Sequence, residues 1–267
     1  MTRAALVAHS GLDHAAMVAL ALAAIAAYGV LWLRRANADP RRLVAWSGGV
    51  LIVLGASSPW MEQIAERTFT GHMIQHLLVI VVAAPLLVVA EPVRTATRSG
   101  VLPATVLGRR AGAVWRRHAA VIGPVTFVAV LFTTHLSSIY DRALTNRWLH
   151  EVEHAGYLIG AVMTWAAVLH ARRSAPLARV GIAMGVAAGG ALLGMILLTA
   201  PEPLIATYEA RLGADDALAD QRNAASIMWI GGMATTVPLL LLGVWRWAAN
   251  EERIARRTEA ITDHPPA

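Results

Sequence analysis

Seven long apolar stretches, separated by short polar segments, constrain this chain more than any other feature. A helix rises about 1.5 Å per residue, so crossing a bilayer takes about 20 predominantly apolar residues. Stretches of about this length lie near residues 15–33, 43–59, 71–90, 119–137, 149–169, 180–200 and 223–245. Only 15% of the residues are charged, whereas an ordinary soluble domain has about 25%. The sequence therefore predicts an all-α polytopic bundle of about seven transmembrane helices in a lipid bilayer. Residues 1–247 would form the transmembrane domain, and residues 248–267 a polar tail that we expect to be mobile.

The distribution of arginine predicts the orientation of this bundle. All 23 basic residues are arginine, and 17 of them follow the first, third, fifth and seventh stretches. By the positive-inside rule these segments face the cytoplasm, which places the amino terminus outside and the polar tail in the cytoplasm. The net charge of +6 then reflects membrane topology, and no nucleic-acid partner is expected. Because the chain has no cysteine, disulfides and thiolate ligands are excluded.

Seven of the ten histidines lie at or near the predicted outer ends of the helices, and four of them form two pairs. His72 and His76 begin the third stretch, and His150 and His154 begin the fifth. A spacing of four residues puts both imidazoles of a pair on one helix face, about one turn apart. His135 ends the fourth stretch at the same predicted depth. A lone interfacial histidine is usually solvated or hydrogen-bonded, but two such pairs predict a metal cluster below the outer surface.

The ligand types limit the metal that such a cluster would hold. Imidazoles suit zinc, copper, iron or nickel, and a thioether beside them favours Cu(I). Met228 begins the last stretch and is the leading candidate for a soft ligand, although methionine in an apolar helix usually only packs. The stretch His150-Glu-Val-Glu-His154 has the histidine spacing of a metalloprotease helix, with Glu151 at the general-base position. It lacks an obvious third ligand of that class, so intramembrane proteolysis is the weaker interpretation.

Three ordered blocks, over about residues 70–235, resemble the polytopic CtaG family of cytochrome c oxidase assembly factors. The first block is His72-Met-Ile-Gln-His76-Leu-Leu with Ala84-Pro85-Leu86-Leu87. The second runs from Thr134-His135-Leu136 through Tyr140-Asp141 to Leu149-His150 and Glu153-His154. The third comprises Asp220-Gln221, Ile227-Met228-Trp229 and Gly231-Gly232.

This resemblance implies a role in maturing a copper-containing terminal oxidase in a bacterial cell (inner) membrane. Oxidase subunits or other assembly factors would be the partners, and no enzyme activity is expected. Carried over by position, the candidate copper ligands are His72, His76, His135, His150, His154 and Met228. Asp220 would orient an imidazole through its ring N–H, as metal-bound histidines usually require. The leading prediction is a metallochaperone that takes Cu(I) at its outer face and passes it on.

Two other functions remain open at this stage. In a membrane redox protein, His76 and His154 would be the two axial ligands of one b-type haem. This prediction needs ligands that face one another across a haem, and it leaves the doubled histidines unexplained. In a transporter, the outer histidines would handle protons or substrate. That prediction requires ionisable groups near mid-bilayer, and the centres of these stretches contain almost none.

Overall fold

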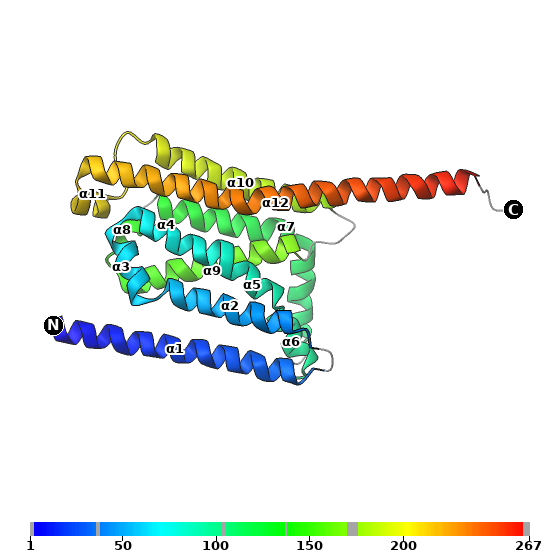
Figure 1. Ribbon diagram of the computed structural model, residues 1–267, viewed down its shortest axis with the longest axis horizontal. Helices are drawn as coiled ribbons and strands as arrows, with labels where there is room; N and C mark the ends of the chain where they lie inside the picture. Colours follow the sequence, from blue (N-terminus) through cyan, green and yellow to red (C-terminus); the bar gives the residue numbers. More distant parts are fainter. Residues whose placement is uncertain (1–2, 36–37, 103–104, 137, 170–175, 264–267) are drawn as a thin grey trace.

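The long helices lie side by side in a bundle, and the two ends of the chain lie at opposite ends of it (Figure 1). The computed structural model describes residues 3–35, 38–102, 105–136, 138–169 and 176–263, and within these ranges it has helices and no strand. Six helical segments are long and apolar enough to span a membrane, and a seventh results if one bent pair is counted as one span. The predicted polytopic helical bundle is thus confirmed, while its orientation stays a prediction.

The helices follow one another in the order α1 (Arg3–Leu33), α2 (Pro40–Ala56), α3 (Pro59–Arg67), α4 (Phe69–Leu77), the π-helix η1 (Leu78–Ala83), α5 (Ala84–Val89), α6 (Pro92–Arg98), α7 (Val106–His135), α8 (Ile139–Ala143), α9 (Arg147–Leu169), α10 (Pro176–Thr199), α11 (Ala206–Leu212) and α12 (Ala214–Asp263). The segment from α4 to α6 forms one candidate span. At one end of the bundle, α4 and α9 begin and α7 ends. We call this the histidine end. The short helices α3, α8 and α11 lie there (Figure 1).

The second predicted stretch, 43–59, is divided by a bend. Helices α2 and α3 are bent by 52° relative to one another, and only together are they long and apolar enough to form one span. The side chain of Ser58 accepts a hydrogen bond from the Met61 N–H and caps α3, and Pro59 occupies its first turn. Serine at the cap followed by proline starts a new helix, since both favour a helix N-terminus. The bend turns α3 across the histidine end.

Proline in the third span produces a π-helix rather than a break. The Ala84 N–H donates to the Val79 carbonyl, five residues back. The next bond in this register would join residue 85 to the Ile80 carbonyl, but Pro85 has no N–H to donate. The Trp165 indole N–H of α9 donates to the Ile80 carbonyl instead, at 2.9 Å. This bond ties the segment after the first histidine pair to the helix that carries the second.

Glycines allow close packing between neighbouring helices. In α10 a Cβ on Gly189 would lie 2.9 Å from the Val128 side chain of α7. Backbones also approach closely between α7 and α9, where a Cβ on Gly123 would come 2.8 Å from the Met163 carbonyl oxygen. The α7–α9 contact therefore places His135 beside the helix of the second pair.

The chain beyond the last predicted stretch is helical. Helix α12 continues without interruption through the predicted boundary at 247/248 to Asp263, and its end projects from the bundle (Figure 1). Arg256 and Glu252 form an ion pair at 3.6 Å on this projecting part. Helix-forming residues and such i, i+4 pairs favour helix even where nothing packs against it. The polar tail is therefore helical over residues 248–263, and its mobility stays a prediction.

Candidate metal centre

Four imidazoles from two helices meet at the histidine end. Adjacent ring centroids lie 4.3 Å apart for His72 and His76 on α4, and 4.2 Å apart for His150 and His154 on α9. Between the helices, the His76 and His154 rings are 5.0 Å apart, and the His72 and His150 rings 5.3 Å. The i, i+4 spacing thus produces two facing pairs. Both α4 side chains are buried, with His72 fully enclosed.

Two carboxylates complete the cluster. Oε1 of Glu153 lies 3.8 Å from Nε2 of His76, and Oε2 of Glu62 lies 3.5 Å from Nε2 of His150. Neither carboxylate is among the predicted ligands. Glu153 follows His150 by three residues and so shares its helix face, a signal that the sequence contains. Glu62 reaches the cluster only because of the bend before α3, which no local spacing indicates.

Hydrogen bonds assign the proton of His72. The Tyr208 hydroxyl donates its one hydrogen to the Ala65 carbonyl at 2.7 Å, so it can only accept from Nδ1 of His72, 3.3 Å away. His72 therefore carries its proton on Nδ1, and its Nε2 offers a bare lone pair. The same reasoning applies to His135, whose Nδ1 lies 2.9 Å from the Leu131 carbonyl and must donate to it.

Most of the buried polar side-chain atoms without a hydrogen-bond partner in the described residues lie at the histidine end. Among the described residues they include Nε2 of every clustered histidine and both oxygens of Glu153. Such an atom costs about 1–3 kcal/mol when nothing compensates it, and native proteins have only a few per 100 residues. The histidines concerned are His72, His76, His135, His150 and His154. Lone pairs that converge in this way fit a bound cation.

Three overlapping groups of ligand atoms fit one metal ion each. In every group the three atoms lie within 4.8 Å of one another. The groups are His72, His76 and His154; Glu62, His150 and His154; and His72, His150 and Glu153. Imidazole nitrogens with at most one carboxylate suit copper or zinc.

His135 lies in the wall of the cluster rather than in one of these groups. Its Nδ1 also lies 3.0 Å from the Tyr157 hydroxyl, and that hydroxyl is hydrogen-bonded to Thr134. Its ring centroid is 5.3 Å from that of Tyr140, which in turn is 5.0 Å from the His72 ring. A ligand role for His135 stays a prediction.

Aromatic residues from the short helices close the histidine end. Tyr140 on α8 and Tyr208 on α11 lie outside the spans, and both side chains are buried against Phe69. Burial raises the pKa of both hydroxyls well above the ordinary value for tyrosine. They therefore stay protonated, and Tyr208 keeps its hydrogen for Ala65.

Asp220 acts through the backbone of α4 rather than on an imidazole. Its carboxylate oxygens accept hydrogen bonds from the N–H groups of Phe69 at 2.6 Å and Thr70 at 3.3 Å. These are among the free N–H groups at the start of a helix, where a carboxylate is most stabilising. The sequence led us to expect a bond to a ring N–H, but Asp220 instead holds the helix on which His72 and His76 lie.

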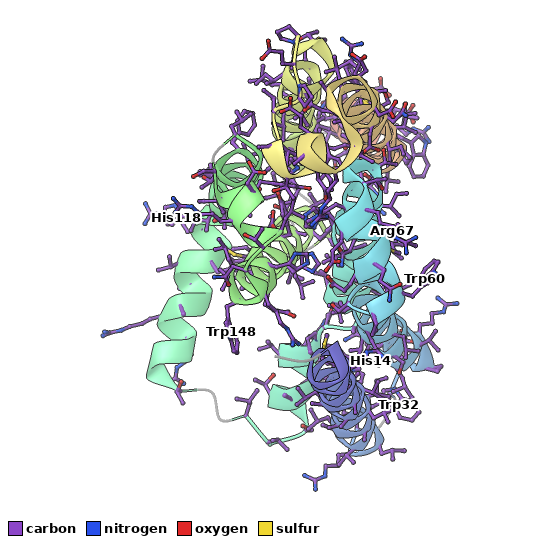
Figure 2. The ribbon with its side chains drawn as sticks, turned by 90° about the vertical axis from the view of Figure 1, so that its left-hand side faces the viewer. His14, Trp32, Trp60, Arg67, His118 and Trp148 are labelled. Carbon is purple, nitrogen blue, oxygen red and sulfur yellow. The ribbon has the colours of Figure 1, made fainter. Side chains whose placement is uncertain are left out.

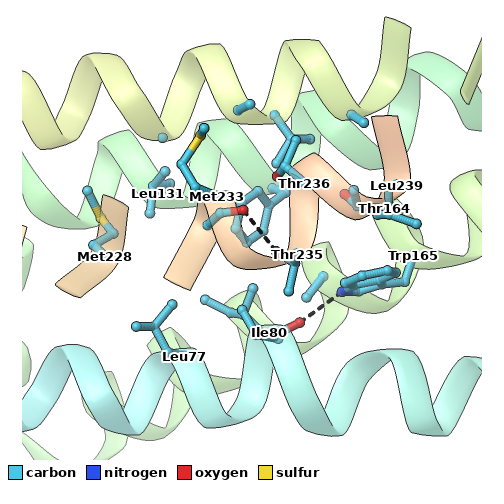
Figure 3. Close-up of a pocket in the computed structure, with 18 of the residues that line it drawn as sticks. Leu77, Ile80, Leu131, Thr164, Trp165, Met228, Met233, Thr235, Thr236 and Leu239 are labelled. Carbon is cyan, nitrogen blue, oxygen red and sulfur yellow. Dashed lines mark hydrogen bonds between the residues drawn. The ribbon is translucent and has the colours of Figure 1, made fainter. Parts of the chain in front are cut away.

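Met228 packs in the apolar core and lines a cavity of about 130 Å³ inside the bundle. Its side-chain methyl lies 3.3 Å from where a Cβ on Gly194 would be. Figure 3 shows the cavity between η1, α9 and α12, lined by apolar side chains and the hydroxyls of Thr164, Thr235 and Thr236. No lining residue is charged. A soft-ligand role for Met228 stays a prediction.

The surface around the cluster is marked by tryptophan. Figure 2 looks onto the histidine end and shows Trp60 and Trp148 at its periphery. Both side chains are largely exposed. Tryptophan is enriched at the level of the lipid headgroups. The cluster therefore lies close to one membrane–water interface.

A family model described as cytochrome c oxidase caa3 assembly factor (Caa3_CtaG) matches residues 7–250. The chain belongs to this family. The match includes every residue of the histidine cluster, so the Caa3_CtaG assignment and the cluster concern the same part of the molecule. It also confirms the resemblance drawn from the three sequence blocks.

Curated relatives of this Caa3_CtaG chain include mycobacterial proteins. The uncharacterized protein Mb0105 of Mycobacterium bovis is 28% identical over 93% of this chain and 40% of its own length. The uncharacterized protein ML1998 of Mycobacterium leprae is 28% identical over 88% of this chain and 38% of its own length. The chain thus spans about two fifths of the curated relatives it matches. No solved structure matches it.

Proposed function

We propose that this cytochrome c oxidase assembly factor binds copper as its cargo in the histidine cluster and delivers it to an oxidase during maturation. The observation that carries the proposal is the set of buried, unpaired Nε2 atoms on facing helices. Imidazoles without thiolates form a site for copper that also tolerates an oxidising exterior. The family supplies the oxidase.

The proposed location is a bacterial cell membrane, with the histidine end outside. The arginine-rich segments after α1 and α5 belong to the opposite end of the bundle (Figure 1). The positive-inside rule places that end in the cytoplasm. Copper would then be received and released at the outer face by contact with oxidase subunits or other assembly factors.

The ring geometry favours a metal ion over the haem alternative. Two axial histidines must face one another across a flat macrocycle. The His76 and His154 centroids are only 5.0 Å apart and their planes are inclined by 73°. The rings of His72 and His150 occupy the adjoining space, each packed against its neighbour in the same helix. Rings this close together favour a metal ion over a porphyrin between them.

The same geometry supports delivery rather than proteolysis. In the metalloprotease pattern, Glu151 would be the general base. The carboxylates beside the imidazoles are those of Glu153 and Glu62, and Glu151 belongs to none of the candidate ligand groups. Delivery of a metal ion requires no chemical turnover, so we propose that the protein is not an enzyme.

Titration of the detergent-purified protein with Cu(I), in competition with bicinchoninate, tests this proposal. The wild type should bind copper without a Soret band in its visible spectrum. Loss of a direct ligand in His76→Ala or His154→Ala should weaken binding by more than the 10- to 100-fold typical of outer partners. His118→Ala is the matched control, because His118 is exposed on α7 and belongs to no candidate group. Equal binding by all variants would refute the site.

A further inference from the structure

We infer that copper occupies two positions in turn within the cluster, and that Glu62 is the ligand that receives it. The mouth position consists of Glu62, His150 and His154, and the inner position of His72, His76 and His154. The inference rests on the proposed copper function and adds a route for the ion. His154 is common to both positions.

The two positions differ in their access to solvent. The side chain of Glu62 is 32% exposed and that of His150 is 12% exposed. The inner ligand His76 is 4% exposed, and His72 is fully enclosed. An ion from solution therefore meets the mouth ligands first. The carboxylate at the mouth also attracts a cation electrostatically before any imidazole can bind it.

Gln75 fixes the orientation of the mouth carboxylate. Its Nε2 donates to Oε1 of Glu62 at 3.0 Å and to the Ala56 carbonyl at 2.8 Å. One oxygen of Glu62 is thereby held, and the other is directed toward Nε2 of His150. Gln75 is fully buried on α4 between the two inner ligands. Helix α4 thus carries both the inner ligands and the residue that orients Glu62 at the mouth.

Helix α3 is held firmly over the cluster. A Cβ on Gly71 would lie 2.6 Å from the Ile64 carbonyl oxygen, so α3 and α4 touch through their backbones. From α11, Tyr208 donates to the Ala65 carbonyl and Arg211 donates to the Glu66 carbonyl. The carboxylate of Glu62 therefore stays at the mouth whether or not an ion is present.

Transfer between the positions is an exchange of ligands around His154. The bonds from copper to the Glu62 oxygen and the His150 nitrogen break as bonds to the Nε2 atoms of His72 and His76 form. The bond to His154 persists, so the ion is never released. No electron is transferred, and each bond lost is replaced by one gained. Release to a partner runs through the same steps in reverse.

Stopped-flow loading with Cu(I)–bicinchoninate, combined with the equilibrium titration, tests this route on the full chain. Glu62→Gln keeps the shape but removes the charge and the anionic ligand. It should slow loading and unloading about tenfold, the lower end of the effect of a charged cleft on association rates. Its affinity should change little, because the inner ligands are intact. Glu66→Gln, which removes the same charge from an exposed site on α3, should load as the wild type does.

Each result decides between the route and the site. Equal loading rates for Glu62→Gln and Glu66→Gln overturn the route while the copper site stands. An affinity loss in Glu62→Gln as large as that in His76→Ala also overturns it, because Glu62 would then hold the resting ion. Absence of copper binding by the wild type overturns the proposed function and the route together. Slow exchange with unchanged affinity in Glu62→Gln alone supports the route.

Discussion

The bond between Trp165 and the Ile80 carbonyl predicts a specific energetic coupling with Pro85. Trp165→Phe removes the indole N–H that donates to this carbonyl from α9, while the new ring still fills most of the volume of the indole. An acceptor left without its partner in a buried place costs about 1–3 kcal/mol. Trp165→Phe should therefore lower the free energy of unfolding by that amount.

Pro85→Ala should change this cost. Residue 85 then has an N–H, which can donate a hydrogen bond to the Ile80 carbonyl in the π-helical register. If the segment becomes α-helical, the Ala84 N–H donates to that carbonyl instead. In the Pro85→Ala background, Trp165→Phe should cost less than about 1 kcal/mol. The difference is a coupling energy of the size found for residues that share one partner.

A double-mutant cycle measures this coupling energy. The wild type, Trp165→Phe, Pro85→Ala and the double variant are unfolded by sodium dodecyl sulfate in mixed micelles, and unfolding is followed by circular dichroism. Trp148→Phe is the matched control, because Trp148 is 82% exposed. It should change the free energy of unfolding by less than about 0.5 kcal/mol. An equal cost of Trp165→Phe with and without Pro85 would refute the proposed exchange of donors.

Three further perturbations have distinct expected outcomes. Asp220→Ala leaves two N–H groups at the start of α4 without their acceptor, although Thr68 still caps the helix. It should destabilise the protein by about 0.5–2 kcal/mol, with partial rescue by Asp220→Asn, measured by the same unfolding assay. Gly71→Ala forces a Cβ against the Ile64 carbonyl, so it should lower the free energy of unfolding by about 1–3 kcal/mol and alter copper loading. In the control Gly232→Ala the new Cβ meets nothing within 4 Å, so this variant should be slightly more stable than the wild type. The opposite ranking of the two variants would contradict the packing. Copper at 100 times its dissociation constant should raise the free energy of unfolding by about 2.7 kcal/mol, and the same concentration should raise that of His76→Ala by less than about 0.4 kcal/mol.

Local periodicity was sufficient to predict the spans and the two histidine pairs. Apolar stretches of bilayer length allow few alternatives to helices, and a spacing of four residues determines which side chains share a helix face. In the structure the two pairs face one another, His72 and His76 on one side and His150 and His154 on the other, which agrees with this reasoning. The structure adds the register between the helices, which local spacing does not contain.

Features that depend on contacts between distant segments could not be predicted in the same way. Glu62 reaches His150 because α3 bends away from α2, and Asp220 finds the backbone of α4 from about 150 residues away. Proline in the third span has no N–H to donate, and the donor that replaces it belongs to α9. In each of these cases, one partner lies in a different helix.

The uncharged cavity beneath the cluster has a consequence for how partners take turns. No lining residue of that cavity is charged, so a cation held among the imidazoles meets an electrostatic barrier toward the membrane interior. On the copper route that we infer, the ion would therefore enter and leave on the side of Glu62. The protein that supplies copper and the protein that receives it would then compete for the same surface and could not bind together. An excess of either one would slow the transfer of copper to the other.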